Sequence, residues 1–400
     1  MFVDSTAGLI PPIISDTDRQ LSWRLSIVIS YLAPPTPLVL FLSSHLHLTM
    51  KTMKALVTTG DARFVLADVP IPVPRSGEIL INVAVIAQNP VDWKYLVIKS
   101  AAAGKIIGWD FSGTVSQLGP HCQNRRLNDR VAGFVPGGAF AEYLVIPEDL
   151  VIVLPETVSF EDAARLGTAC ITACQCLYQE LGIPIPLDEH GLLVDEPILI
   201  WSGASSTGQY AIQLARLSGM RVVATAAPEN HEFLKFLGAD EVFDHSDSWT
   251  ARKIVSATAG TLCMAVDCWS QGMSPNQVSS SLDPRGGRIA TVLPYASRTP
   301  FIETTCVAAN SIFGQDTSFP LTTTGHTSHV SNGIAYCKLI SHLLTLTKLK
   351  FPPAKQYPRG LLSVLEGMEY MRQGKVHAEK IIYRISDTPL SKIAKYMYGL

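Results

Sequence analysis

Short apolar and β-branched runs, interrupted by turn residues, dominate the chain between positions 53 and 158. The runs that predict strands are residues 55–58, 64–68, 78–87, 113–117, 130–134 and 141–146. Prolines and glycines such as Pro72, Gly77 and Pro120 lie between these runs and mark turns. The pattern predicts a β-rich domain of barrel or sandwich type.

The spacing of apolar residues changes after position 158. Within 159–181 they recur every three or four positions, which predicts one helix. Strands then alternate with helices, and this alternation predicts parallel βαβ units. The expected strands are 197–201, 221–225, 241–244, 264–268 and 287–293, and the expected helices between them are 209–218, 229–237 and 249–257. A helix over 360–373 and a strand over 380–385 follow, and we expect this tail to pack back onto the first domain.

The first 52 residues fit neither pattern. Residues 25–48 are mostly apolar, but three prolines at 34, 35 and 37 divide them into two short runs. A membrane-spanning helix needs about 17–25 apolar residues in succession, and Asp4, Asp16 and Asp18 stand where a secretory signal is basic. We expect residues 1–52 to be a dispensable leader that reflects a mis-assigned translation start; a membrane or organelle anchor is the alternative.

Composition restricts the class of protein without identifying it. The 400 residues include 34 acidic and 32 basic side chains, so a net charge of −2 provides no basic field for nucleic acid. Eight cysteines are too few for a disulfide framework and favour a reduced, cytoplasmic compartment. Cys170, Cys174 and Cys176 form a thiol cluster without a nearby histidine, and we expect them in the core.

Residues 197–219 carry the most specific local pattern. A buried strand enters the turn Gly203-Ala204-Ser205-Ser206-Thr207-Gly208, and this turn opens a helix. Backbone N–H groups in such a turn, with the helix N-terminus, bind a pyrophosphate. We expect Gly203 to permit the tight turn and Gly208 to permit close helix–strand approach. Hydroxyl residues replace the central glycines of the full dinucleotide fingerprint, so an ordinary strand–turn–helix connection is the alternative.

The end of the next strand bears on the choice of dinucleotide. NAD-binding sites place an acidic residue there to hold the ribose 2′-hydroxyl, whereas this chain has Thr225 followed by Ala226 and Ala227. Without an acid there is no repulsion against a 2′-phosphate, so NADPH is favoured over NADH. No arginine stands at this point. The side chains left to bind the phosphate are Thr225, Asn230, His231 and Lys235.

Longer segments resemble the medium-chain dehydrogenase/reductase superfamily. They are residues 218–225 and 237–244 in the second domain, and 89–94, 108–115 and 128–133 in the first. Within the superfamily the chain is most similar to stand-alone, trans-acting enoyl reductases that serve fungal polyketide synthases, from about Met53 to the C-terminus. The resemblance implies an α/β fold: a GroES-like catalytic domain over 53–175, completed by 345–400, and a Rossmann NADPH-binding domain over 176–344.

The resemblance also implies a set of site residues. Lys94 is a candidate for the proton donor, Tyr95 is a weaker candidate, and the identity of the donor stays open. The implied cofactor-binding residues are Asn89, Pro90, Val91, Asp92, Gly203, Ala204, Ser205, Ser206, Thr207, Gly208, Thr225, Ala227, Asn230, His245, Leu293, Val376 and His377. Thr168, Gly314 and Gln315 are expected to border the substrate. The alternatives are a salt-bridged surface turn for Asp92 and Lys94, a packing role for His377, and ordinary loop chemistry for Gly314 to Asp316.

Zinc-dependent members of the superfamily differ from this chain at their ligand positions. They carry a cysteine near position 89 and Gly-His-Glu near position 108, where this chain has Asn89 and Gly108-Trp109-Asp110. The four closely spaced cysteines of their structural zinc lobe are also missing from the sequence. Because zinc needs three or four N, S or O ligands at once, we expect a zinc-free protein.

Without a metal to polarise an isolated carbonyl, hydride addition to a conjugated C=C bond is the natural chemistry. The resemblance implies that NADPH reduces the α,β-double bond of an enoyl thioester carried by a polyketide synthase, which would be the partner. Two alternatives stay open: an NADPH-dependent quinone or enone oxidoreductase, and a non-catalytic NADPH-binding protein. Members of this subgroup are often single subunits, although an edge strand near 292–310 would allow a dimer.

Overall fold

The computed structural model describes residues 51–99, 102–186, 195–318, 322–389 and 397–399. Contacts divide the chain into two units, Met1–Thr49 and Met50–Leu400, and the following description concerns the second. Nearly all of the expected leader therefore lies outside the described residues. Within the described part, no helix has the length and apolar character that crossing a membrane requires.

One half of this unit is a mainly antiparallel β structure. Its largest sheet has the order β16-β17-β3-β4-β5-β7, and β6 also pairs with β3. The strands are β3 Glu78–Ala87, β4 Asp110–Leu118, β5 Arg130–Phe134, β6 Tyr143–Pro147, β7 Ile152–Val153, β16 Ala354–Tyr357 and β17 Lys380–Arg384. A second sheet contains β1 Thr52–Thr58, β2 Arg63–Pro70 and β18 Met397–Gly399.

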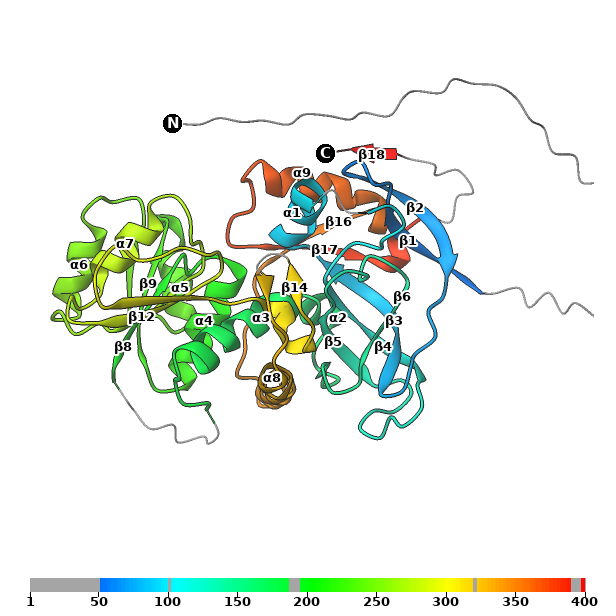
Figure 1. Cartoon of the computed structure of the whole chain (residues 1–400), viewed down its shortest axis with the longest axis horizontal. Helices are drawn as coiled ribbons and strands as arrows, with labels where there is room; N and C mark the ends of the chain where they lie inside the picture. Colours follow the sequence, from blue (N-terminus) through cyan, green and yellow to red (C-terminus); the bar gives the residue numbers. More distant parts are fainter. Residues whose placement is uncertain (1–50, 100–101, 187–194, 319–321, 390–396, 400) are drawn as a thin grey trace, which may run out of the picture. The chain divides into compact units, whose positions relative to one another are not determined.

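The end of the chain completes the first sheet. Strand β17 runs antiparallel to β3, with Ile382 opposite Ala87, and β16 pairs in parallel with β17. Figure 1 shows β17, near the red end of the colour scale, beside blue β3. Residues almost 300 positions apart therefore share one sheet.

The other half contains a six-stranded parallel sheet. Its order is β10-β9-β8-β11-β12-β13, and every pairing is parallel. The strands are β8 Pro197–Trp201, β9 Arg221–Ala226, β10 Glu241–Asp244, β11 Met264–Asp267, β12 Gly287–Thr291 and β13 Ile302–Cys306. This is the Rossmann order, and the expected α/β fold is confirmed. In such sheets ligands bind at the carboxyl ends of the strands where the order reverses, which here lies between β8 and β11.

Helices connect and cover these strands. The α-helices are α1 Pro90–Lys99, α2 Phe160–Ala163, α3 Gly167–Cys174, α4 Ser206–Leu217, α5 His231–Leu237, α6 Thr250–Ala257, α7 Ser274–Ser281, α8 Thr327–Thr345 and α9 Val364–Arg372. Shorter elements are the π-helix η1 Gln175–Glu180, the 3₁₀ turns η2 Pro228–Asn230, η3 Ala309–Phe313, η4 Gly360–Ser363 and η5 Ile385–Asp387, and the hairpin of β14 Thr317–Ser318 with β15 Thr322–Thr323.

The single helix expected over 159–181 is wrong in detail, because the structure divides it into α2, α3 and η1. The first break has a clear cause. The buried carboxylate of Asp110 accepts the backbone N–H of Thr168 at 2.8 Å and so caps a new helix. Gly167 allows this approach, since a Cβ atom there would lie 2.5 Å from the Asp110 carboxylate.

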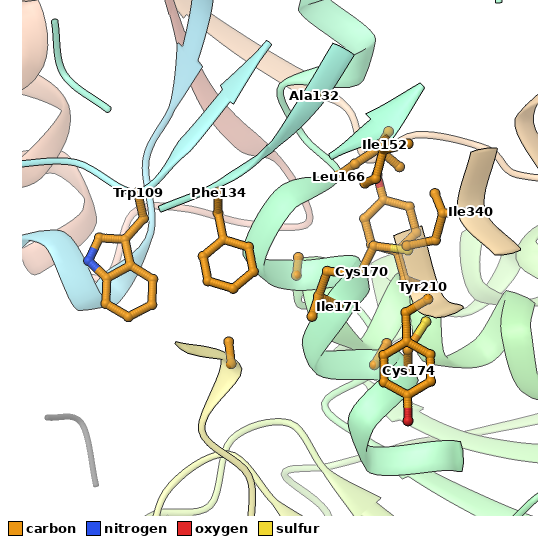
Figure 2. Close-up of a cluster of buried hydrophobic side chains, with 14 of the residues drawn as sticks. Trp109, Ala132, Phe134, Ile152, Leu166, Cys170, Ile171, Cys174, Tyr210 and Ile340 are labelled. Atoms are coloured by element: carbon orange, nitrogen blue, oxygen red, sulfur yellow. The ribbon is translucent and has the colours of Figure 1, made fainter. Parts of the chain in front are cut away.

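Helix α3 lies in a large buried cluster that joins the two halves. Figure 2 shows Cys170 and Cys174 of α3 near Leu166 and near Tyr210 of α4. Both cysteines are fully buried, as is Cys176. The expectation that these thiols are core residues is confirmed.

Candidate active site

A cavity of about 620 Å³ opens at the carboxyl ends of β8 and β11. Three parts of the chain form its walls. The antiparallel half contributes the start of α1, with Trp109 and Thr168. The parallel half contributes the turn after β8 and residues that follow its other strands. The tail contributes Val376 to Lys380, which lead into β17. The cavity therefore lies where the parallel sheet predicts a ligand.

The turn after β8 is built to leave the N-terminus of α4 open. Ser205 caps the helix: its hydroxyl accepts the N–H of Gly208 at 3.1 Å and donates to the carbonyl of Ser202 at 2.8 Å. Ser206 and Thr207 begin the helix and line the cavity. Because the first N–H groups of a helix have no partner within it, this end of α4 suits an anionic ligand.

The two glycines of this turn have different roles. The residue with positive φ is Ser202, at 60°, and not Gly203, so the expectation that Gly203 permits the tight turn is wrong. A Cβ atom on Gly203 would instead lie 2.8 Å from Leu234 Cδ1. On Gly208 it would lie 2.6 Å from the Ser202 carbonyl oxygen. Both glycines therefore permit close helix–strand approach, which we expected for Gly208 alone.

Thr225 does not reach the cavity. Its side chain is fully buried, and its hydroxyl accepts the Ser202 N–H at 3.0 Å, so it braces the turn. This placement argues against the expected phosphate contact. Ala227, Asn230 and His245 do line the cavity at this end. Among its described lining residues, Glu379 is the one acidic side chain.

A buried chain of polar contacts lies beneath the opposite wall. The ammonium of Lys380 donates to Asn89 Oδ1 at 2.5 Å and forms an ion pair with Asp110 Oδ2 at 2.9 Å. The carboxylate of Asp92 accepts the backbone N–H of Asn89 at 2.7 Å. Burial raises the pKa of Asp92 well above its usual value. These contacts fix the loop that presents Asn89 to the cavity.

This arrangement does not fit a zinc ion. The positions expected to hold ligands in zinc-dependent relatives carry Asn89, Trp109 and Asp110, and the ammonium of Lys380 already lies against two of them. In the part of the chain that the structure describes, no group of three or more His, Cys, Asp or Glu side chains is suited to a metal. That the protein acts without zinc stays a prediction.

Lys94 is the exposed end of this wall. It lines the cavity, is half-buried, and forms no ion pair with any described residue. Desolvation lowers its pKa. The alternative of a salt bridge between Asp92 and Lys94 at the surface is wrong, because Asp92 is 2% exposed and bonds to Asn89 instead.

Thr168 also faces the cavity, but its hydroxyl proton is already donated to a hydrogen bond. Its hydroxyl and its backbone N–H both donate to Asp110 Oδ1. Toward the cavity the hydroxyl oxygen therefore offers lone pairs. Thr168 is suited to accept a hydrogen bond, and not to stabilise a negative oxygen.

Several expected residues lie elsewhere. Asp92, Tyr95 and Gln315 line a second cavity of about 550 Å³, whereas Gly314 lines neither cavity. The backbone glycines Gly203 and Gly208 and the buried Thr225 are absent from the lining of the first cavity. The expected residues that the first cavity does bring together are Asn89, Pro90, Val91, Lys94, Thr168, Ala204, Ser205, Ser206, Thr207, Ala227, Asn230, His245, Leu293, Val376 and His377.

Two structural contacts could not be read from local patterns. The amide of Gln209 donates to the carbonyls of Ala204, at 2.8 Å, and Ala378, at 3.1 Å. It thereby ties the turn after β8 to the loop that carries His377. Lys380 likewise joins Asn89 across almost 300 positions. Only the tertiary fold reveals either pairing.

Family models match both halves of the chain. Residues 75–156 match the alcohol dehydrogenase GroES-like domain, and residues 206–312 match a model described as zinc-binding dehydrogenase. The two matches fall on the antiparallel and the parallel half respectively.

Curated relatives cover most of the sequence. The trans-enoyl reductase ACTTS2 of Alternaria alternata is 34% identical over 349 residues, which span 84% of this chain and 100% of the relative. The trans-enoyl reductase buaC of Petromyces alliaceus is 31% identical, over 84% of this chain and 98% of its own.

Solved structures share the fold. The CurK enoyl reductase superposes with a TM-score of 0.68 at 20% identity, over 84% of this chain and 99% of its own. A quinone oxidoreductase from Coxiella burnetii gives a TM-score of 0.63 at 24% identity, with the same coverage. At these identities the likeness establishes architecture alone.

Proposed function

We propose a specific reaction for this chain, which belongs to the trans-enoyl reductases of the medium-chain dehydrogenase/reductase family. As a member it is an oxidoreductase that acts on C=C bonds with a nicotinamide cofactor. The proposed reaction is reduction of the α,β-double bond of an enoyl thioester by NADPH. The proposed source of the thioester is the carrier domain of a polyketide synthase.

The observation that carries the proposal is the position of Lys94. An ammonium group without an ion-pair partner among the described residues lies in the same cavity as the open N-terminus of α4. The cavity thus combines a binding site for a dinucleotide pyrophosphate with a proton donor. Both are needed to saturate a polarised double bond.

The chain's own residues fit the cofactor. Ser206 and Thr207 at the helix N-terminus would hold the pyrophosphate, while Asn230 and His245 line the end of the cavity proposed for the 2′-phosphate. When bound, NADPH supplies the hydride that adds to the β-carbon of the substrate. The end of β9 carries Thr225 and Ala226 in place of the acid that NAD-binding sites use, and this supports NADPH over NADH.

We propose two donors for the enolate that forms as the double bond is reduced. Lys380 donates to Asn89 Oδ1, which fixes the side-chain amide so that its Nδ2 group is the free end. That Nδ2 group is buried and has no hydrogen-bond partner in the described structure. Asn89 Nδ2 and the Lys94 ammonium are therefore the proposed oxyanion donors, each worth about 3–4 kcal/mol. Lys94 then gives a proton to the α-carbon and regains one from solvent.

The partner and the assembly follow from the family and are proposals. We propose that the chain acts in the cytoplasm as a single subunit and meets its substrate on a polyketide synthase. The printed names of the relatives, as trans-acting enoyl reductases, support this assignment. The mouth of the cavity must then admit the arm that carries the thioester.

The test is NADPH oxidation by the full chain with three substrates: a crotonyl thioester of pantetheine, the same acyl group on a carrier domain, and a quinone. We expect turnover of a thioester with NADPH, and at least ~10-fold lower kcat/KM with NADH. Turnover of the quinone alone would make the protein a quinone oxidoreductase. Tight NADPH binding without turnover of any substrate would favour the non-catalytic alternative.

A further inference from the structure

Two cavities meet at one aromatic residue. The dinucleotide cavity, about 620 Å³, and the second cavity, about 550 Å³, have separate linings except for Trp109, which belongs to both among the described residues. Helix α1 and the turn η3 run past both. Helix α1 presents Lys94 to the first cavity and Tyr95 to the second, and η3 presents Ala309 to the first and Phe313 to the second.

The indole of Trp109 is held firmly in this position. It stacks on Phe134 with ring centroids 5.8 Å apart and planes 5° from parallel, and Phe134 meets Phe313 edge-on at 5.4 Å. Figure 2 shows the rings of Trp109 and Phe134 side by side at the edge of the buried cluster. Only 5% of Trp109 is exposed.

The backbone around Trp109 is equally constrained. Gly108 has φ of +92°, and a Cβ atom there would lie 2.1 Å from the ring of Phe140. The Trp109 carbonyl accepts the N–H of Val135 at 3.0 Å. Because ring and backbone are both fixed, the indole is a rigid wall that a ligand must go around.

The second cavity suits an acyl chain. Ile106, Ile107 and Phe313 give it one apolar side, while charged side chains such as Lys105 and Asp316 line the rest. Its volume lies within the usual range of about 300–1,000 Å³ for ligand sites. It shares Trp109 with the dinucleotide cavity, and helix α1, which begins next to Asn89 and carries Lys94, lines both. A chain whose double bond lies at those donors has this space for its remaining carbons.

We propose that Trp109 is a specificity-determining residue: the acyl chain passes the edge of its indole into the second cavity, so chains that are linear near the double bond are accepted and chains branched at the γ-carbon are excluded. This inference rests on the proposed function, since it places an enoyl chain in the site. Phe134 supports one face of the indole, so the ring cannot easily turn aside for a branched chain. In a close-packed site, one added methyl group changes kcat/KM by about 10–200-fold.

The experiment compares wild type with Trp109→Ala and with a matched control, Trp93→Ala. Trp93 lines the dinucleotide cavity but not the second cavity, so its truncation enlarges one space without opening the passage. The substrates are two pantetheine thioesters with eight acyl carbons, of 2-octenoate and of 4-methyl-2-heptenoate. We expect wild type to prefer the linear chain by about 10–200-fold. Trp109→Ala should lower that ratio at least ~10-fold, and Trp93→Ala should leave it unchanged.

An unchanged ratio in Trp109→Ala, or an equal fall in Trp93→Ala, would overturn the proposal. A second readout is independent of turnover: the Kd values of the two saturated thioesters, measured by calorimetry with NADP⁺ present, should show the same preference and the same loss. If wild type reduces neither thioester but this binding preference holds, the proposed function fails while the role of Trp109 stands. If binding shows no preference either, both fail.

Discussion

Lys94 illustrates how one residue's surroundings decide its chemistry. The half-buried position of its ammonium and the absence of a carboxylate partner among the described residues leave its charge partly desolvated, and this lowers its pKa. A lysine in this state holds its proton less firmly than an exposed one. It is correspondingly better suited to give that proton to a carbanion.

We predict that Lys94→Met lowers kcat by about 10²–10⁴-fold, the usual contribution of a general acid. The pH profile tests the assignment further. Lysine is charged below its pKa, so wild-type kcat/KM should fall as pH rises through a value below that of an ordinary lysine, about 10.4. Lys94→Arg should shift this fall to higher pH, because guanidinium keeps its proton. A Lys94→Met profile that keeps the alkaline fall would assign the titration to another group.

At the residue scale, prediction from the sequence identified residues that line the cavity where a motif marks them, and their roles stay predictions. Asn89, Ser205 and His377 all line the cavity. It failed at Thr225, because position along a strand does not reveal that the side chain turns back to bond Ser202. Asn310, which lines the second cavity, was also missed, since that cavity forms only when distant loops meet.

The start of α4 is the element on which cofactor binding depends most directly. Both glycines of its turn lack room for a Cβ atom, but their neighbours differ. At Gly203 the obstructing atoms are the ends of the Leu234 and Ile212 side chains, whereas at Gly208 they are backbone atoms of Ser202 and Gly203. Side-chain ends can shift, and backbone in a capped turn cannot.

We therefore predict that Gly208→Ala is more damaging than Gly203→Ala. Overpacking should lower the free energy of unfolding by about 1–3 kcal/mol in Gly208→Ala, with a loss of NADPH affinity as the helix moves away from β8. Gly203→Ala serves as the matched control and should fall at or below the lower end of that range. Urea unfolding and NADPH fluorescence titration measure the two effects. Equal losses in both variants would contradict the distinction between backbone and side-chain contacts.

Elements with strong periodicity were predictable, often to the residue. The strands β3, β5, β8 and β10 have the expected bounds. Helix α8 was missed although its buried residues Tyr336, Ile340 and Leu343 recur with helical spacing. The break between α2 and α3 could not be predicted, because the carboxylate that caps α3 belongs to Asp110 on strand β4.

At the scale of the whole molecule, the buried pair of Asp110 and Lys380 joins β4 to the last strand of the first sheet. The two side chains are 0% and 4% exposed. Removing one partner leaves the other charge buried without compensation, which is far more costly than removing both. Substitutions at this pair therefore test whether the tail contributes to the stability of the antiparallel half.

We predict that Lys380→Met alone lowers the free energy of unfolding by about 3–5 kcal/mol. The double variant Asp110→Asn with Lys380→Met should recover much of that loss, because no unpaired charge is left. Denaturant unfolding of both single variants, the double variant and wild type completes the cycle. Additive losses would show that the two groups do not interact in solution.

Strand β17 also imposes an order on synthesis. One edge of β3 pairs with β4, but at Val85 to Ala87 the opposite edge has no neighbour until β17 has been synthesised. At about 5–20 residues per second, a ribosome needs roughly 15–60 s to translate the intervening stretch. Throughout that interval an apolar strand edge stays open and the carboxylate of Asp110 lacks its cation. The nascent chain is thus exposed to mispairing for much of its translation, and the first half cannot close until β17 leaves the exit tunnel.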